Sequence, residues 1–119
     1  DGIIPSIDHI LKMPVPIIGI CYGFQYMAMQ SGGKLEDGTI RIKTTSLKGI
    51  VKLNGKEEEV NMWVNHFDKV LTLPTKKWKI DSVVNGQIMM AHTNKWVGFQ
   101  FHPEYKKKQF EQFILPLIK

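Results

Sequence analysis

The stretch from Val15 to Gln25 constrains the fold more than any other part of the chain. Val15–Ile20 is a short apolar run rich in β-branched residues, which predicts a buried strand. Gly19 and Gly23 flank Cys21, so the chain can turn sharply from this strand into a helix without side chains colliding. This pattern is typical of a nucleophile elbow with cysteine in place of serine. It places the thiol where the backbone N–H groups of a helix start favour a thiolate and can receive an oxyanion.

A plainer interpretation of Cys21 stands beside this one. A lone cysteine after an apolar strand is usually a buried small hydrophobe. As the only cysteine of the chain, Cys21 also excludes an internal disulfide and is typical of a reducing compartment. The residues further along the chain have to decide between the two interpretations.

The composition predicts one folded domain. A chain of 119 residues with 43% hydrophobic and 23% charged residues is long enough for a modest core and too apolar for disorder. The net charge of +5 comes from scattered lysines with no stripe of interleaved aromatic residues, so nucleic-acid binding has little support. The sequence has neither a membrane-length apolar run nor a basic leader, which predicts a cytoplasmic protein with no membrane partner.

The pattern along the chain predicts an α/β domain, because a strand, a sharp turn and a helix around Cys21 form the building block of a parallel sheet. The run Glu57–Glu59 is interpreted as a solvated stretch, with metal binding by paired carboxylates as the minor alternative. Helices are expected over residues 6–12, 22–31 and 109–115. Strands are expected over residues 15–20, 39–44, 49–53, 60–64, 78–84, 87–92 and 96–101, with hairpin turns at 54–55 and 85–86 and a polar loop at 65–68.

The last predicted strand leads into Phe101-His102-Pro103-Glu104. Pro103 blocks further regular pairing, so His102 and Glu104 are held just past the carboxyl end of a strand. With Cys21 as nucleophile, His102 as base and Glu104 as the group that orients the imidazole, the three roles of a triad are filled. Zinc binding is the rival use, but His-x-Glu with one distant cysteine matches no common zinc spacing, so no metal site is expected.

The motifs Gly19–Gln25 and Gly98–Glu104 together resemble the class I, or triad, glutamine amidotransferases. The resemblance implies a flavodoxin-like α/β domain that hydrolyses the side-chain amide of glutamine through a thioester and passes ammonia to a synthetase. Within this family, Tyr22 and the segment Met62–Val70 are most similar to the glutaminase part of GMP synthetase. This implies GMP formation from XMP, with no cofactor in this domain and with ATP and Mg²⁺ used by the partner synthetase.

The resemblance also implies which residues contact the substrate. The N–H of Tyr22 would donate to the oxyanion, and Gln25 would hydrogen-bond the glutamine. The backbone of Phe67 and Asp68 would hold the α-amino and α-carboxylate groups of the glutamine. His66 would be structural or pocket-lining.

The sequence departs from the family pattern in three places. In the family, a Gly-rich loop, commonly Gly-Gly-Pro, lies before the segment that Asp1–Met13 resembles and gives the second oxyanion donor, and the given sequence does not contain it. We therefore expect residues 1–119 to be the C-terminal portion of a single domain that lacks its N-terminal strands and is completed by an N-terminal segment. Phe67 replaces a usual glycine, and the segment after Gly33 follows the GMP synthetase pattern poorly. Two alternatives stay open: the same triad acting on another γ-glutamyl amide, and a non-catalytic interaction module.

Overall fold

The computed structural model describes residues 11–12, 16–36, 42–53, 55–66 and 68–118. The helix expected over residues 6–12 lies almost wholly outside this part of the chain. Among the described residues, no helix has the length and apolar character needed to cross a bilayer.

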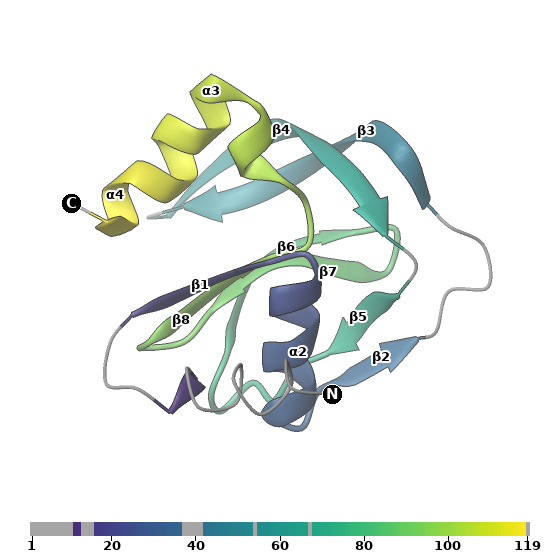
Figure 1. Ribbon diagram of the computed structural model, residues 1–119, viewed down its shortest axis with the longest axis vertical. Coiled ribbons are helices and arrows are strands. Elements are labelled where there is room, and N and C mark those ends of the chain that lie inside the picture. The colour runs from purple at the N-terminus through teal and green to yellow at the C-terminus, as the bar shows by residue number, and fades with distance from the viewer. Residues whose placement is uncertain (1–10, 13–15, 37–41, 54, 67, 119) are drawn as a thin grey trace.

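A four-stranded mixed sheet forms the centre of the structure, in the order β1-β8-β7-β6 (Figure 1). Strand β1 (Ile17–Ile20) runs parallel to β8 (Trp96–Phe99). Strand β7 (Gln87–His92) is antiparallel to both β8 and β6 (Lys79–Val84). The parallel pairing expected around the elbow is therefore confirmed for β1 and β8, whereas the rest of this sheet is antiparallel.

The turn between β6 and β7 confirms the hairpin expected at residues 85–86. Asn85 and Gly86 both have positive φ, at 51° and 77°, as a two-residue type I′ turn requires. Asparagine and glycine tolerate this left-handed conformation better than other residues, which is why the sequence signal was reliable.

Helix α2 (Tyr22–Gln30) packs on one face of the sheet, as predicted, and ends where Gly32 takes a φ of +92°. Phe24 and Met27 are its largest fully buried side chains, and the ring of Phe24 meets the indole of Trp78 edge-to-face with centroids 5.9 Å apart. These apolar contacts hold the start of α2, and with it Cys21, against the end of β1.

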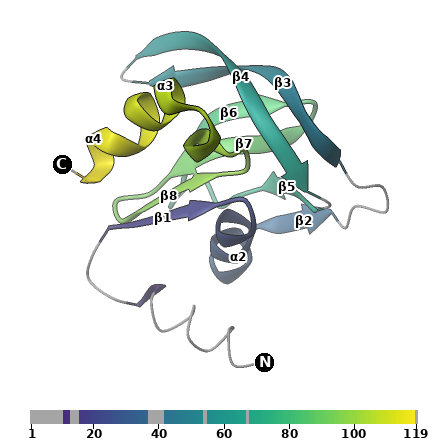
Figure 2. The ribbon, with the colours of Figure 1, turned by 45° about the horizontal axis from the view of Figure 1, so that its top comes forward.

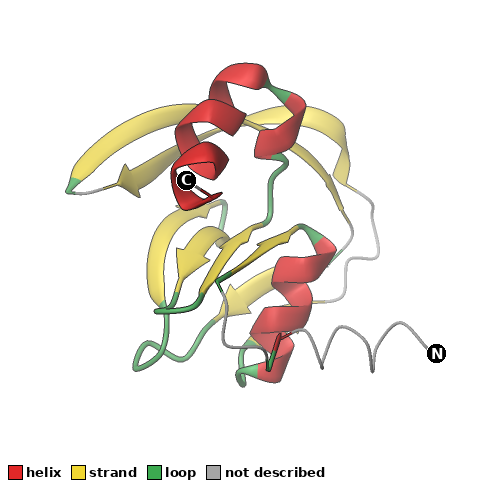
Figure 3. Cartoon of the chain, turned by 60° about the vertical axis from the view of Figure 1, so that its left-hand side comes forward, coloured by secondary structure: helices red, strands yellow, loops and turns green. Residues whose placement is uncertain are grey.

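The opposite face carries a long hairpin and the C-terminal helical segment, so that the sheet lies between two layers (Figure 3). Strands β3 (Ile42–Leu53) and β4 (Lys56–His66) are antiparallel and arch over β6 and β7 (Figure 2). The Ser82 hydroxyl donates to the carbonyl of Ile50 at 2.6 Å, which ties the arch to the sheet edge.

The C-terminal segment is helical from Lys107 to Ile118. It follows the 3₁₀ turn η1 (Pro103–Tyr105) and consists of α3 (Lys107–Gln109), the π-helical turn η2 (Phe110–Ile114) and α4 (Leu115–Ile118). Phe113 from this segment packs edge-to-face on Phe99 and Phe101 with ring centroids 6.1 and 5.8 Å away. The predicted closing helix is confirmed, although it starts earlier and continues through a proline.

Several element boundaries differ from the sequence prediction. Residues 39–41 of the strand expected at 39–44 lie outside the described residues. From Ile42 on, this strand and the one expected at 49–53 are a single strand, β3, because the residues between them also pair with β4. The polar loop expected at 65–68 is shorter, because β4 continues to His66. The short pair β2 (Lys34–Glu36) and β5 (Lys69–Thr72) was not predicted at all. The run Glu57–Glu59 is exposed, as predicted, but lies within β4.

Candidate active site

Cys21 lies at a strand–turn–helix elbow, as the sequence predicts. Its N–H donates to the carbonyl of Phe99 at 2.6 Å, and its carbonyl accepts the first helical hydrogen bond, from the N–H of Gln25, at 3.0 Å. The backbone is at φ 54° and ψ −104°, a left-handed conformation that is strained for any residue except glycine. The turn thus holds the thiol in one place at a cost in local strain.

Only one of the two flanking glycines is required by packing in the described part of the chain. A Cβ at Gly19 would stand 2.8 Å from Met27 Sδ and 3.0 Å from the carbonyl carbon of Gly23. A Cβ at Gly23 would point into open space. The prediction that both glycines prevent collisions in the turn is therefore right for Gly19 and wrong for Gly23, because Gly23 is already in helical conformation and faces outward.

His102 and Glu104 form a close pair just beyond β8. The backbone N–H of His102 donates to the carbonyl of Trp63 at 2.8 Å, so the segment that follows β8 is anchored to β4. His102 Nδ1 lies 2.8 Å from Glu104 Oε2. Pro103, between the two residues, starts the 3₁₀ turn that brings the carboxylate of Glu104 to the imidazole of His102. With Nδ1 as the donor to the carboxylate, proton exchange falls to Nε2.

The register of the parallel pair brings the two motifs to the same edge of the sheet. Ile20 is the register partner of Phe99, so Cys21 and Gln100 are the residues that directly follow β1 and β8. Gln100 Nε2 lies 3.6 Å from Cys21 Sγ. The negative charge of Glu104 also acts on the thiol. The two motifs are far apart in sequence, and their residues converge at the carboxyl ends of β1 and β8.

The environment of Cys21 raises the pKa of its thiol. Burial is the largest cause, the backbone N–H of Tyr22 and the side chain of Gln100 lower the pKa, and the charge of Glu104 raises it. The predicted preference for a thiolate is therefore wrong for the thiol as a whole: the Tyr22 N–H and the Gln100 side chain favour the thiolate, but burial outweighs them. A thiol in this setting needs a base to become a nucleophile.

The residues predicted to contact substrate are brought together in part. Gln25 is buried, and its Nε2 donates both to the carbonyl of Asp68 at 3.0 Å and to Gln100 Oε1 at 3.1 Å. Tyr22 exposes 63% of its surface beside the elbow. Phe67 lies outside the described residues, and of His66 only the backbone, at the end of β4, is described.

Gln100 is the residue of this site that the sequence prediction missed. It lies within the motif Gly98–Glu104 and two positions before His102, and an extended backbone at this point, just past the end of β8, would put both side chains on one side. This spacing is the signal that would have found it. A buried glutamine next to a nucleophile is expected to have a defined hydrogen-bonding task.

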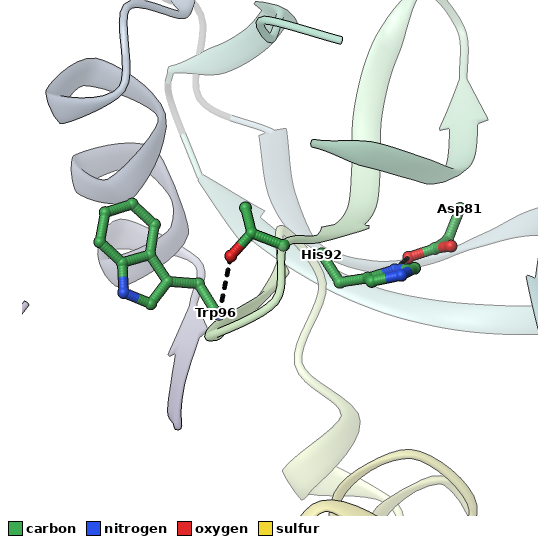
Figure 4. Close-up of polar contacts among 4 residues, drawn as sticks. Asp81, His92 and Trp96 are labelled. Carbon is green, nitrogen blue, oxygen red and sulfur yellow. Dashed lines mark hydrogen bonds and ion pairs between the residues drawn. The ribbon is translucent and has the colours of Figure 1, made fainter. Parts of the chain in front are cut away.

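A second histidine–carboxylate pair lies at the other end of the sheet (Figure 4). His92 Nδ1 is 2.8 Å from Asp81 Oδ2, and the next residue, Thr93, accepts a hydrogen bond from the N–H of Trp96 at 2.9 Å. His92 pairs with Val97 near the start of β8, away from the end that precedes His102. The sequence predicts a strand position without catalytic part for His92, and its position at the end of β7 is confirmed.

Two hollows lie away from Cys21. The larger, of about 870 Å³, is an open groove of mixed charge between β4 and the C-terminal helical segment. The smaller, of about 330 Å³, lies around Trp96, and half of its lining residues are lysines. Size alone would favour the larger groove, but the strained elbow, the buried amides and the histidine–carboxylate pair converge at Cys21. We therefore place the candidate active site at the thiol.

The fold and this arrangement of side chains define a class of protein. The family described as class-I glutamine amidotransferase matches residues 1–118, and the chain belongs to this family. The resemblance seen in the two sequence motifs is thereby confirmed.

Relatives within the family carry one name. The chain is 35% identical to a glutamine-hydrolysing GMP synthase from Cellvibrio japonicus and 32% identical to one from Yersinia enterocolitica, in both cases over 92% of this chain and 25% of the relative. The chain thus spans about a quarter of the length of these curated relatives.

Solved structures share the fold. A protein from Thermoplasma acidophilum, described as a putative GMP synthase subunit, superposes with a TM-score of 0.74 at 24% identity, over 92% of this chain and 60% of that one. A glutamine amidotransferase from Thermotoga maritima gives a TM-score of 0.69 at 22% identity, over 92% of this chain and 50% of that one. The expected α/β fold of the family is therefore confirmed for the portion that this chain covers.

Proposed function

We propose that this chain is the glutaminase part of a GMP synthase. It hydrolyses the side-chain amide of glutamine and supplies ammonia to an ATP-dependent synthetase that converts XMP to GMP. The observation that carries the glutaminase proposal is the 2.8 Å pair of His102 and Glu104 at the same sheet edge as the strained Cys21. The names of the relatives support the GMP branch.

The first half of the proposed reaction forms a thioester. Cys21 Sγ attacks the side-chain carbonyl carbon of glutamine while its proton passes to His102 Nε2. The N–H of Tyr22 donates to the oxyanion that develops on the carbonyl oxygen. The imidazolium then gives its proton to the leaving nitrogen, the C–N bond breaks, and ammonia departs.

The second half regenerates the thiol. Water attacks the thioester carbon while His102 accepts its proton, the C–S bond breaks, and glutamate leaves as the sulfur regains a proton. Glu104 stabilises the imidazolium in both halves without taking its proton. In this proposal ATP and Mg²⁺ belong to the synthetase, and the glutaminase steps use the side chains and backbone of the domain.

The substrate contacts and the completion of the domain are part of the proposal. Gln25 and the backbone of Phe67 and Asp68 hold the glutamine. An N-terminal segment of the same domain, carrying a Gly-Gly-Pro loop, pairs with β1 on the side away from β8 and gives the second oxyanion donor. This is supported by the length of the relatives and by the position of β1 at the end of the strand order in the described part of the sheet.

The test is glutamate release from glutamine, measured with the whole chain. Cys21→Ser and His102→Ala are each expected to lower the rate about a thousandfold or more, because the triad acts as a unit. Glu104→Ala should keep more residual activity, since it weakens the orientation of the imidazole without removing the base.

A matched control is His92→Ala, which removes a histidine–carboxylate pair of the same 2.8 Å length at the other end of the sheet. It should hydrolyse glutamine at the rate of the unsubstituted chain. Equal activity of the Cys21→Ser variant and the unsubstituted chain would overturn the proposal. Labelling of Cys21 by a glutamine analogue with an electrophilic carbon in place of the amide gives a second readout.

A further inference from the structure

A continuous line of buried amides connects Cys21 to the start of β5. Gln100 is fully buried and Gln25 is 6% exposed. The carbonyl of Asp68 accepts from Gln25 Nε2, Gln100 Oε1 accepts from the same Nε2, and Gln100 Nε2 donates to Cys21 Sγ at 3.6 Å. Two side chains therefore join the main chain at Asp68 to the sulfur.

The carbonyl of Asp68, at one end of this line, determines which atom donates and which accepts in every hydrogen bond along it. A backbone carbonyl can only accept, so Gln25 must present its NH₂ group to Asp68. The second proton of the same NH₂ group then points at Gln100, so Gln100 must accept this hydrogen bond with Oε1. The NH₂ group of Gln100 is left on the side of Cys21. The geometry thus makes the sulfur an acceptor.

We propose that Gln100 is a further catalytic residue, whose side-chain amide donates to the sulfur of Cys21 and stabilises its anionic form, while Gln25 acts as a positioning residue for that amide. This inference rests on the proposed glutaminase function. Burial disfavours a charged sulfur, and an N–H donor offsets that cost. Gln100 and the Tyr22 N–H act in this same direction on the thiol, whereas Glu104 opposes them.

The amide contributes at each step in which the sulfur carries charge. When His102 takes the thiol proton, the Gln100 N–H bond to sulfur becomes charge-assisted and strengthens. It weakens in the thioester, where sulfur shares its electrons with the acyl carbon. When water displaces the sulfur, the electron pair of the C–S bond returns to it, and the same N–H stabilises the leaving group.

The experiment measures the rate at which iodoacetamide alkylates the thiol between about pH 6 and pH 10. Because the chain has one cysteine, alkylation reports on Cys21 alone. Gln100→Met keeps the length of the side chain and removes the donor. Its alkylation midpoint is expected to rise by about one pH unit, and the rate at neutral pH to fall about tenfold.

Gln109→Met is the matched control. Gln109 is also a buried glutamine, 8% exposed, and its Nε2 donates to the carbonyl of Asn61 at 2.6 Å on β4. This variant loses a buried amide hydrogen bond of the same kind at another place, so it carries a similar cost in stability. Its alkylation midpoint should match that of the unsubstituted chain.

Gln25→Met tests the line without altering the group that touches sulfur, and it keeps the proposal testable if Gln100→Met does not fold. It should raise the midpoint by less than Gln100→Met does, and should add nothing in the Gln100→Met background. An unchanged midpoint in both single variants, or independent and additive shifts in the double variant, would overturn the proposal.

Alkylation needs no glutamine, so the two proposals fail separately. If the unsubstituted chain hydrolyses glutamine but Gln100→Met titrates like the control, the role of Gln100 is wrong and the glutaminase function stands. If the midpoint shifts as expected but no glutamine is hydrolysed, the effect of Gln100 on the sulfur stands and the proposed function is wrong.

Discussion

The absence of a side chain at Gly98 sets how closely α2 approaches the sheet. A Cβ at this position would stand 2.0 Å from Cδ1 of Phe24, a ring that is fully buried. Gly98 is the register partner of Gly19 on β1, whose own Cβ would meet Met27. Two facing glycines on neighbouring strands therefore accept the two largest fully buried side chains of the helix.

Gly98→Ala should lower the free energy of unfolding by about 1–3 kcal/mol or more, because a close-packed ring has to leave its position. Chemical denaturation measures the change. Gly23→Ala is the matched control: its Cβ meets nothing in the described structure, and alanine in a helix gains up to about 1 kcal/mol over glycine. Equal destabilisation by both substitutions would contradict this account of the contact.

At the scale of single residues, the sequence identified side chains with distinctive chemistry and missed those defined by their surroundings. Cys21 and the His102–Glu104 pair could be predicted, because the elbow pattern and Pro103 fix local geometry. The contact of Gln100 with sulfur depends on the pairing of β1 with β8, which no local pattern encodes. The open space at Gly23 depends on packing in the same way.

At the scale of elements, the hairpin of β6 and β7 contains a buried carboxyl that pairs with a histidine on the neighbouring strand. Asp81 is 9% exposed, and its side chain reaches His92 on the neighbouring strand. Burial raises the pKa of the Asp81 carboxyl, whereas the hydrogen bond and charge of His92 and the charge of Lys79 lower it. The folded hairpin therefore binds the carboxyl proton more tightly than the unfolded chain.

Asp81→Asn should change how the free energy of unfolding depends on acidic pH. With the folded pKa above the unfolded value, the stabilisation is complete below the ordinary carboxyl range and is lost as the pH rises through the raised pKa. The difference in stability, Asn variant minus unsubstituted chain, should therefore grow over that window. Denaturation at a series of pH values tests this, with Glu57→Gln at an exposed position of β4 as a control for the lost charge. A constant or shrinking difference would refute it.

Elements with strong local signals were predicted well, and elements defined by tertiary contacts were not. Asn85-Gly86 predicted the hairpin correctly, because both residues readily adopt the positive φ that its turn requires. The sequence predicted a gap between two strands at residues 45–48, yet β3 runs through them because they pair with β4. The pair β2 and β5 has three and four residues, too few for a periodic pattern to appear.

At the scale of the whole molecule, the central sheet has an apolar core on each face. One core surrounds Phe24 and Trp78 under α2, and the other surrounds Phe99 and Phe113 beneath the C-terminal helical segment. The cores share the strands of one short sheet, so we expect them to unfold together.

Phe113→Leu should lower the stability of both cores by the same amount, about 1–2 kcal/mol. In a Trp63→Phe background, tryptophan fluorescence follows Trp78 and Trp96 in the core under α2, while circular dichroism follows the whole chain. The two unfolding curves should coincide and shift together. A shift of the dichroism curve that leaves the fluorescence curve in place would show two independent cores.

The family could be predicted from two short motifs, because each places chemically distinctive residues at a fixed spacing. The match of the family to residues 1–118 confirms this prediction. The arrangement around them could not. The arch of β3 and β4 over the sheet depends on contacts such as Ser82 with Ile50, between residues that are distant in sequence. Neither residue has a chemical character that predicts the other.

The left-handed backbone of Cys21 has an evolutionary consequence. A non-glycine residue in such a conformation costs on the order of 1–3 kcal/mol, and glycine adopts it freely. A gene copy released from selection for catalysis would gain stability by drifting to glycine at this one codon. The identity of residue 21 in a homologous sequence therefore records whether that lineage still uses the thiol.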